Sequence, residues 1–311
     1  MKAIVLAKPG GIEELKTMEL EKPVLKEGEV LVQVKAISIN PADVKTRTGA
    51  GMYSRINIES PFIPGWDIAG VVTEANNATF KPGDEVFGMV NFPGLGKAYA
   101  EFVAVPANQL ALKPANISFE QAAAATLAAL TAYQALVKNA TITPGQRVLI
   151  HAAAGGVGHF AVQIAEHLGA HVTGTSSAAN RDFVLSLGAD DHIDYKSHNW
   201  QQSTSSFDFV LDTVGGDNLN LSIAVTKPGG SLISILGFND ERKAKASSKG
   251  VKGDAILVYS SGEDMKVIAD WLQKGVIKAH VSATFPFDKM GEAHLQVETG
   301  RTVGKVIVTV H

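Results

Sequence analysis

A glycine-rich turn lies between an apolar run and a segment with helical spacing. The apolar run covers residues 148–150, and the turn reads AAGGVG at residues 153–158. Aligned to the dinucleotide-binding fingerprint G-x-G-x-x-G, its marked positions are Ala153, Gly155 and Gly158, so the first glycine is absent. Gly155 would allow a pyrophosphate to approach the backbone, and Gly158 would allow the helix to pack closely on the strand. The turn predicts a dinucleotide site, with a tight turn that binds nothing as the alternative.

A helix that starts directly after a strand offers free N–H groups and the positive end of its dipole to anions. We therefore expect the backbone of Gly155, Gly156 and Val157 to bind the phosphates. A site that selects the unphosphorylated ribose carries Asp or Glu about 20 residues further on. That stretch instead contains Ser176 and Arg181, with no acid before residue 182. Because Arg binds phosphate oxygens through paired donors, these residues favour a 2′-phosphate, and hence NADPH over NADH. The alternative for Arg181 is a charge on a helix surface.

The elements that must position this turn change character along the chain. Short β-branched runs at residues 2–6, 29–38 and 68–74 predict a sandwich or small barrel in the first third. Ser118 and Gln121 form a capping box that predicts a helix over residues 122–138. Apolar runs then alternate with helical spacing, at residues 147–152, 171–175, 207–212 and 231–236. This alternation predicts a parallel sheet, with residues 262–274 as one more helix on it. Residues 277–311 return to β texture, with one helix from about residue 288.

The composition limits the class of protein. The chain has 311 residues, 45% hydrophobic and 19% charged, so it can form one large or two ordinary domains. It contains no Cys, which excludes disulfides, thiolate metal sites and a Cys nucleophile. A net charge of −3 gives no overall attraction to nucleic acid or anionic lipid. The first apolar run is too short for a signal peptide, and no stretch reaches the ~18 apolar residues of a membrane span. A cytoplasmic protein with no nucleic-acid or membrane partner is expected.

Seven short motifs occur in a specific order. They are INPAD at residues 39–43, PGWDIAG at 64–70, KPGDEV at 81–86, AYAE at 98–101, LTAY at 130–133, the turn at 152–158 and GKV at 304–306. In this order the chain resembles the zinc-independent quinone oxidoreductases of the medium-chain dehydrogenase/reductase family, and is similar to the zeta-crystallin-like enzymes over essentially its whole length. The resemblance implies an α/β protein with two domains. A GroES-like β domain would comprise residues 1–119 and 275–311, and a Rossmann-type doubly wound parallel sheet domain that binds NADPH would comprise residues 120–274.

Zinc-dependent relatives in this family hold a catalytic zinc through Cys and His side chains. Here the corresponding motifs read NPAD at residues 40–43 and WD at residues 66–67, and the four-Cys structural lobe is absent. The resemblance therefore implies no zinc, and NADPH-dependent hydride transfer to a quinone, an acceptor that needs no Lewis acid. Reduction of an enone or enal is the alternative within the same chemistry. A protein that binds NADPH as a sensor, without catalysis, is the alternative from another class.

The same resemblance carries site residues onto this chain. Two are expected to be catalytic: Asn40 through its amide and Tyr53 through its phenol. Beyond the turn, the expected cofactor contacts are Thr131 near the nicotinamide, Tyr195 near the adenosine phosphate, Leu236 and Gly237 after a parallel strand, and Lys305 in the cofactor cleft. The alternatives are a turn residue for Asn40, a packed aromatic for Tyr53 and an exposed charge at a strand start for Lys305.

Two further segments carry expectations of their own. Residues 240–252 are rich in Lys and Arg, which predicts a solvated flexible loop. The alternative is an entrance for a phosphorylated or coenzyme A-linked substrate. The resemblance also implies a homodimer formed through an edge strand of the nucleotide domain, here residues 254–259.

Overall fold

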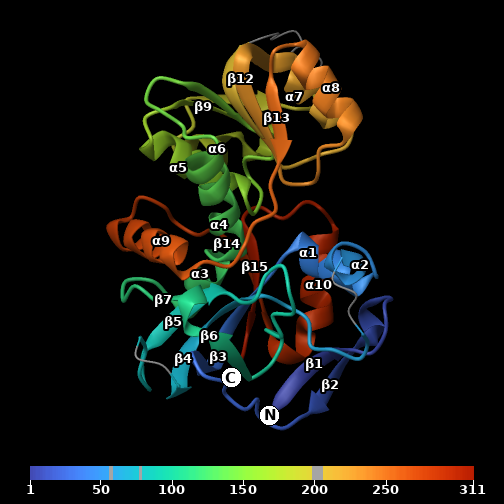
Figure 1. The fold of residues 1–311 in the computed structure, drawn as a ribbon, viewed down its shortest axis with the longest axis vertical. Coiled ribbons are helices and arrows are strands. Elements are labelled where there is room, and N and C mark those ends of the chain that lie inside the picture. The colour runs from blue at the N-terminus through green and yellow to red at the C-terminus, as the bar shows by residue number, and fades with distance from the viewer. Residues whose placement is uncertain (56–58, 77–78, 198–205) are drawn as a thin grey trace. The chain divides into compact units, whose positions relative to one another are not determined.

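The structure is a computed structural model that describes residues 1–55, 59–76, 79–197 and 206–311. The chain divides into two compact units, one made of residues 1–130 and 258–311 and the other of residues 131–257. The first unit is therefore assembled from both ends of the chain, drawn in blue and red in Figure 1. These divisions do not coincide with the predicted boundaries near residues 119 and 275, and the limits of independently folding domains stay a prediction.

The first unit is built on a seven-stranded sheet of order β14-β15-β3-β4-β5-β7, with β6 paired to β3. Its strands are β3 (Glu29–Ile39), β4 (Asp67–Ala75), β5 (Glu85–Met89), β6 (Phe102–Pro106), β7 (Leu110–Leu112), β14 (Val281–Pro286) and β15 (Lys305–Thr309). β14 and β15 run parallel, whereas the other pairs are antiparallel. β1 (Lys2–Leu6) and β2 (Leu15–Glu19) form a separate antiparallel pair. The predicted β-rich first third and the returning β tail are confirmed.

The helices of the first unit are mostly short. They are η1 (Ile12–Glu14), α1 (Pro41–Arg47), α2 (Met52–Arg55), η2 (Ala107–Gln109), α3 (Phe119–Ala124), α9 (Gly262–Lys274), η6 (Phe287–Lys289) and α10 (Met290–Glu298). The predicted capping box is present, because Gln121 N donates to Ser118 Oγ and Ser118 N donates to Gln121 Oε1. The continuous helix predicted after it is wrong. Thr126 Oγ1 donates to Ala123 O at 2.8 Å, where α3 ends, and the chain continues as α4 (Leu127–Tyr133) and a π-helical turn, η3 (Gln134–Asn139).

Helix α9 has the predicted bounds but not the predicted partner. It packs on β7 and η2 of the first unit rather than on the parallel sheet. Gly262 makes this possible, since a Cβ there would lie 2.5 Å from the carbonyl oxygen of Asn108. The buried apolar face of the helix consists of Met265, Ile268 and Leu272, and Gly262 and Asp264 in its first turn are also buried. Such a face specifies an apolar surface but not which one, so the sequence pattern alone left the choice open.

The second unit contains a six-stranded, fully parallel sheet of order β10-β9-β8-β11-β12-β13. Its strands are β8 (Arg147–Ile150), β9 (His171–Ser176), β10 (Asp191–Asp194), β11 (Phe207–Asp212), β12 (Thr226–Ser234) and β13 (Lys252–Ala255). Its helices include α5 (Gly158–His167), η4 (Ala178–Asn180), α6 (Arg181–Ser186), α7 (Asn218–Val225) and α8 (Asp240–Ser248). Numbered within the unit, the order is 3-2-1-4-5-6, that of a doubly wound dinucleotide-binding sheet. The predicted parallel sheet is confirmed.

The basic segment at residues 240–252 is ordered, and the predicted flexible loop is wrong. It forms helix α8, because the side chain of Asn239 accepts from Arg242 N at 3.0 Å and caps the first turn. Lys245 Nζ donates to Asn220 Oδ1 at 2.8 Å, and Lys249 Nζ donates to the carbonyl oxygens of Ile223 and Ala224 in the last turn of α7. These lysines thus satisfy polar groups of the neighbouring helix.

The expected edge strand is only partly present. β13 is at one edge of the six-stranded sheet and ends at Ala255, so residues 256–259 lie beyond it.

Within the described parts of the chain, no helix combines the length and apolar character required to traverse a lipid bilayer.

Candidate cofactor site and buried polar network

The glycine-rich turn of the second unit connects the end of β8 to the start of α5. Gly158 begins α5, and a Cβ at this position would lie 2.1 Å from Ala152 O and 2.7 Å from Ala153 Cα. Only glycine allows this approach of helix to strand, as the fingerprint alignment predicts. A Cβ at Gly155 would lie 3.1 Å from Ala152 O, a tight contact but not an overlap. The turn therefore has the form of a cradle at a helix N-terminus, which fits a pyrophosphate.

The end of the second strand holds this turn in place. Thr175 Oγ1 is hydrogen-bonded to His151 Nδ1 at 3.1 Å and accepts from Ala152 N at 3.3 Å, and Thr175 O accepts from Ala153 N at 2.8 Å. Ala152 adopts a φ of +47°, a left-handed conformation that these bonds maintain. Burial lowers the pKa of His151 to about 4, against the opposing charge of Asp212. At neutral pH the ring beside the turn is therefore uncharged.

A second turn follows β11, the neighbour of β8. The buried carboxylate of Asp212 accepts from Val214 N at 2.9 Å, Gly215 N at 2.7 Å and Ser222 Oγ at 2.6 Å. Thr213 Oγ1 donates to His151 O at 2.7 Å, which joins this turn to the first. In a doubly wound sheet, ligands bind outside the carboxyl ends of the strands where the strand order reverses, which here is between β8 and β11. Both turns lie at that place.

The residues expected to select NADPH lie after β9 and β10. Ser176 is 4% exposed; its Oγ donates to Ser177 O at 3.1 Å and is hydrogen-bonded to His192 Nε2 at 2.8 Å. Tyr195 N donates to Ser176 O at 3.2 Å, and Tyr195 is 54% exposed. Arg181 begins α6 with a side chain that is 60% exposed and lies 3.5 Å from Asp182. The structure brings Ser176, Tyr195 and His192 together, with Arg181 close enough for its charge to act on His192.

The remaining expected cofactor residues occupy other places. Leu236 and Gly237 follow β12, also at the carboxyl edge of the parallel sheet; Leu236 is 49% exposed and Gly237 has a φ of +99°. Thr131 is buried in α4, at the first residue of the second unit. Lys305 lies in the first unit and is considered next. The roles of all these residues toward a cofactor stay predictions.

Asn40 lies at the centre of a buried polar network in the first unit. It caps α1, with Asn40 N donating to Asp43 Oδ2 at 2.7 Å. Its amide Nδ2 donates to Asp67 Oδ2 at 2.8 Å, and its Oδ1 accepts from Lys305 Nζ at 2.5 Å. Lys305 is only 3% exposed, so the alternative of an exposed charge is wrong. The amide of Asn40 thus connects a buried ammonium to a buried carboxylate.

This network contains two carboxyl groups and one amino group. Burial raises the pKa of Asp67, and the nearby Lys305 opposes this effect. Burial and the charge of Asp67 together raise the pKa of Asp43 to about 7. Burial lowers the pKa of Lys305, whereas Asp67 and Asp43 raise it. Asp67 Oδ1 also accepts from Leu127 N at 3.1 Å, so the same carboxylate holds the start of α4. The protonation states of Asp43, Asp67 and Lys305 therefore depend on one another.

Tyr53 lies in α2 and packs against Phe62, with ring centroids 6.2 Å apart. Its hydroxyl lies 3.5 Å from Ser60 Oγ, at the limit of a hydrogen bond. The ring therefore forms part of a small apolar cluster that includes Leu6. A catalytic role for Tyr53 stays a prediction.

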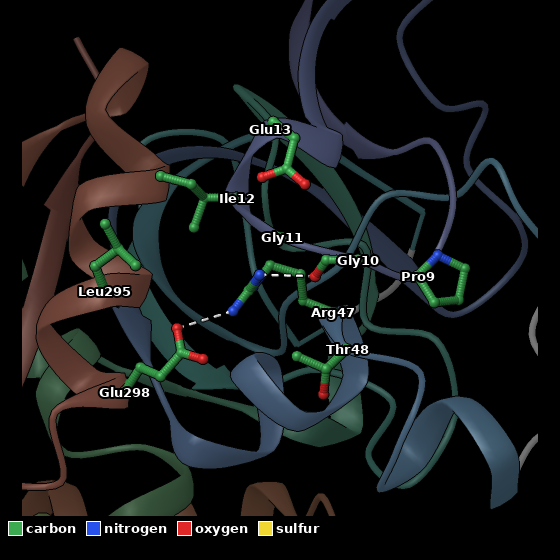
Figure 2. Close-up of a pocket in the computed structure, with 9 residues that line it drawn as sticks. All are labelled: Pro9, Gly10, Gly11, Ile12, Glu13, Arg47, Thr48, Leu295 and Glu298. Atoms are coloured by element: carbon green, nitrogen blue, oxygen red, sulfur yellow. Dashed lines mark hydrogen bonds and ion pairs between the residues drawn. The ribbon is translucent and has the colours of Figure 1, made fainter.

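An open pocket of about 520 Å³ lies on the first unit (Figure 2). It is lined by Pro9, Gly10, Gly11, Ile12, Glu13, Arg47, Thr48, Leu295 and Glu298. The buried guanidinium of Arg47 donates to Gly10 O at 2.7 Å and forms an ion pair with Glu298 at 3.0 Å. None of the expected site residues lines this pocket. Arg47 serves to join α1, the loop after β1 and α10.

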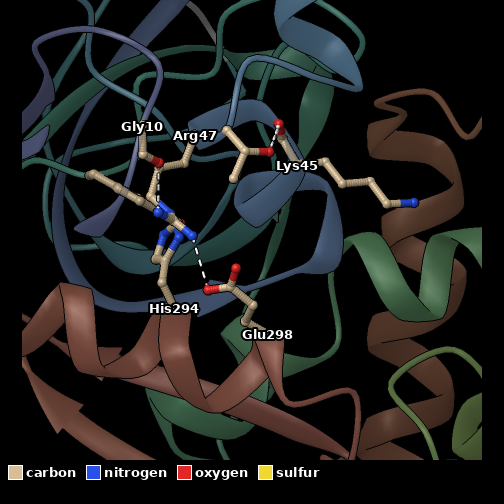
Figure 3. Close-up of polar contacts among 7 residues, drawn as sticks. Gly10, Lys45, Arg47, His294 and Glu298 are labelled. Carbon is tan, nitrogen blue, oxygen red and sulfur yellow. Dashed lines mark hydrogen bonds and ion pairs between the residues drawn. The ribbon is translucent and has the colours of Figure 1, made fainter. Parts of the chain in front are cut away.

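The ring of His294 lies beside the Arg47 guanidinium (Figure 3) and its Nε2 is 2.9 Å from Tyr99 Oη. Burial, and then the charge of Arg47, lower the pKa of His294 to about 3. The imidazole is therefore neutral at physiological pH, and the contact with Tyr99 is a hydrogen bond between uncharged groups.

The residues at the zinc-ligand positions have other partners. Trp66 is buried, donates from Nε1 to Gly94 O at 2.7 Å and packs edge-on against Phe92. Asn40 and Asp67 belong to the network with Lys305. Among the residues that the structure describes, no three His, Cys, Asp or Glu side chains are grouped to hold a metal ion. The donor set does not fit a zinc site, and independence from zinc stays a prediction.

Comparisons with known proteins agree with this architecture. Residues 26–115 match the alcohol dehydrogenase GroES-like domain, and residues 187–308 match the zinc-binding dehydrogenase domain. The 2-methylene-furan-3-one reductase of Solanum lycopersicum is 35% identical over 99% of this chain and 79% of its own length. The chloroplastic NADPH-dependent alkenal/one oxidoreductase of Arabidopsis thaliana is 34% identical with the same coverage. The solved quinone oxidoreductase of Coxiella burnetii superposes with a TM-score of 0.93 at 32% identity, covering 100% of this chain and 99% of its own.

The chain belongs to the medium-chain dehydrogenase/reductase family and is an oxidoreductase of the quinone oxidoreductase kind. The predicted family, the GroES-like domain and the Rossmann-type sheet are confirmed. Four residues beside the turns were not expected from the sequence: His151, Thr175, Asp212 and His192. Each lies in or directly after a strand of the parallel sheet, mostly at its carboxyl end, and that position was the available signal.

Proposed function

We propose that this protein uses NADPH to reduce a quinone by two electrons, without a metal. The observation that carries the proposal is the glycine-rich turn at the point of strand-order reversal in a 3-2-1-4-5-6 sheet. Its place in a family that includes a solved quinone oxidoreductase supports this acceptor. The motifs in which zinc-dependent relatives carry Cys and His read NPAD at residues 40–43 and WD at residues 66–67 here, which supports a reaction without a Lewis acid.

When bound, the nicotinamide supplies the hydride. The backbone N–H groups of Gly156 and Val157 bind the pyrophosphate, and Gly155, whose own N–H donates to Ala152 O at 2.8 Å, allows it to approach the backbone. The bonds that Thr175 accepts from Ala152 N and Ala153 N keep the start of this turn in a fixed arrangement. Ser176, Arg181 and Tyr195 bind the adenosine 2′-phosphate. In the first unit, Tyr53 is the candidate group to hydrogen-bond the acceptor oxygen. Asn40 stands at the start of α1 and is fixed there by Asp43, Asp67 and Lys305.

Reduction of an enone or enal is the second candidate, favoured by the similarity to relatives named as reductases of a methylene-furanone and of alkenals and alkenones. Steady-state oxidation of NADPH, with a 1,4-naphthoquinone and with an α,β-unsaturated ketone as acceptors, separates the two. Faster turnover of the naphthoquinone is expected. Faster turnover of the enone would favour enone reduction over quinone reduction. Tight binding of NADPH without turnover of either acceptor would favour a sensor that binds NADPH without catalysis. A metal assay of the same preparation is expected to find no activity-linked zinc.

Arg181→Ala is expected to raise the Michaelis constant for NADPH about 10- to 100-fold and to leave that for NADH nearly unchanged. A hydrogen bond to a charged group contributes about 1.5–3 kcal/mol, and Arg181 is accessible to a phosphate. Initial rates with each cofactor give the ratio. Lys243→Ala removes an exposed positive charge from α8, which packs on β13 at the opposite edge of the sheet, and is the control. An unchanged ratio of the two constants in Arg181→Ala would mean that NADPH is not selected here.

We propose a homodimer through residues 254–259, of which the first two belong to the edge strand β13, and a cytoplasmic location. An unpaired strand edge supports the first, because it can extend the sheet into a second copy. Lys252 and Asp254 lie on this edge, so the contact would include polar side chains. Sedimentation velocity reports the mass of the assembly.

A further inference from the structure

His192 makes a contact that the proposed cofactor site does not yet explain. Its Nε2 lies 2.8 Å from the Oγ of Ser176, the buried hydroxyl expected beside the 2′-phosphate. The sheet register accounts for the contact. Asp194 lies opposite Ser176, and His192 lies opposite Gly174, so the side chains of Ser176, His192 and Asp194 lie on one face of the sheet, the face onto which a side chain at residue 174 would also point. A Cβ at Gly174 would overlap Val184 at 2.5 Å, so the glycine is needed for α6 to approach this face.

The charges around His192 come from two elements. Arg181 of α6 disfavours a positive imidazole, and Asp194 of β10 favours it. Asp182, next to Arg181, is exposed and lies 3.5 Å from the guanidinium. Burial, followed by Arg181, lowers the pKa of His192, which leaves the ring neutral at neutral pH. A dianionic group bound between Arg181 and Ser176 would reverse this balance, because an opposite charge within about 4–6 Å favours the charged form.

We propose that His192 is a specificity-determining residue that takes up a proton when the 2′-phosphate binds, so that preference for NADPH over NADH increases as the pH falls from 8.5 to 6.5. This inference rests on the proposed use of NADPH. The imidazolium then adds a second cation to Arg181. Its Nε2–H donates to Ser176 Oγ, so that the hydroxyl hydrogen can turn from Ser177 O to the phosphate. NADH has no phosphate at this position and would bind without this protonation.

The test measures proton uptake on cofactor binding. Calorimetric titrations of NADPH in buffers with different ionisation enthalpies, at pH 7.5, give the number of protons bound. We expect uptake for the natural protein with NADPH, much less with NADH, and loss of the difference in His192→Gln, which keeps a hydrogen-bonding group but does not titrate. The ratio of the dissociation constants for NADH and NADPH should fall about tenfold between pH 6.5 and pH 8.5 in the natural protein, and much less in the variant.

A second variant, His192→Asn, guards against a folding defect, and circular dichroism of both variants checks that they are folded. The 2′-phosphate itself titrates near pH 6, so at pH 7.5 it is almost fully deprotonated before binding and its own proton change contributes little. Equal proton uptake in the natural protein and the folded variants would overturn the role of His192. Failure of NADPH to bind at all would instead refute the proposed function, so the two failures are distinct.

Discussion

Lys305→Met is expected to lower the free energy of unfolding by about 3–5 kcal/mol, because it leaves buried carboxyl groups without their cation. Lys305 is 3% exposed and donates to Asn40 Oδ1 and, at 3.1 Å, to Ile39 O. Methionine retains the length and apolar stem of lysine but removes the charge. Urea denaturation followed by circular dichroism gives the difference. Lys45→Met, on the exposed side of α1, is the control and is expected to change stability by less than about 0.5 kcal/mol.

The pH dependence of this loss has a definite sign. Without Lys305, Asp67 is expected to bind a proton more tightly in the folded chain than in the unfolded one. Stability then falls as the pH rises, so the deficit of Lys305→Met should be larger at pH 8 than at pH 5. Adding Asp67→Asn should recover much of the loss, since the Asn40 amide can turn to accept from the new amide. If Lys305→Met and the double variant with Asp67→Asn were equally destabilised, packing and not charge would account for the loss.

Gly158→Ala is expected to abolish dinucleotide binding and to destabilise the second unit by about 1–3 kcal/mol or more. The added methyl group would overlap backbone atoms of Ala152 and Ala153, which cannot move away as a flexible side chain can. Gly155→Ala is the matched variant in the same turn, where the nearest atom is 3.1 Å away. We expect Gly155→Ala to have a free energy of unfolding close to that of the natural protein. It should bind NADPH more weakly, because the added Cβ would face the pyrophosphate.

Chemical denaturation and fluorescence titration with NADPH, applied to both glycine variants, separate these effects. The expected pattern is a loss of stability in Gly158→Ala and a loss of affinity alone in Gly155→Ala. Unchanged affinity in both variants would place the dinucleotide away from this turn.

Local patterns predicted most of the elements but few of the long-range contacts. The capping box at Ser118, the β-branched runs and the alternation after residue 145 each depend on near neighbours, and each matched an observed element. Lys305 at the start of a strand was indistinguishable from an exposed charge, since only the pairing of β15 with β3 buries it beside Asn40. The lysines of α8 were similarly ambiguous until α7 was in place to accept their hydrogen bonds. The contact of His192 with Ser176 depends on the register of two strands, which no local pattern specifies.

The position of β15 between β14 and β3 has a consequence for synthesis of the chain. Asn40 and Asp67 are made early, but their counterion Lys305 follows Asn40 by 265 residues. At roughly 5–20 residues per second, this delay lasts on the order of 10 to 50 seconds. All of residues 131–257 leave the ribosome in that interval, so the second unit has its complete sequence before the first can close its sheet. Until the last strand arrives, Asp43 and Asp67 have no Lys305 beside them, so we expect the region around Asn40 to remain incompletely folded.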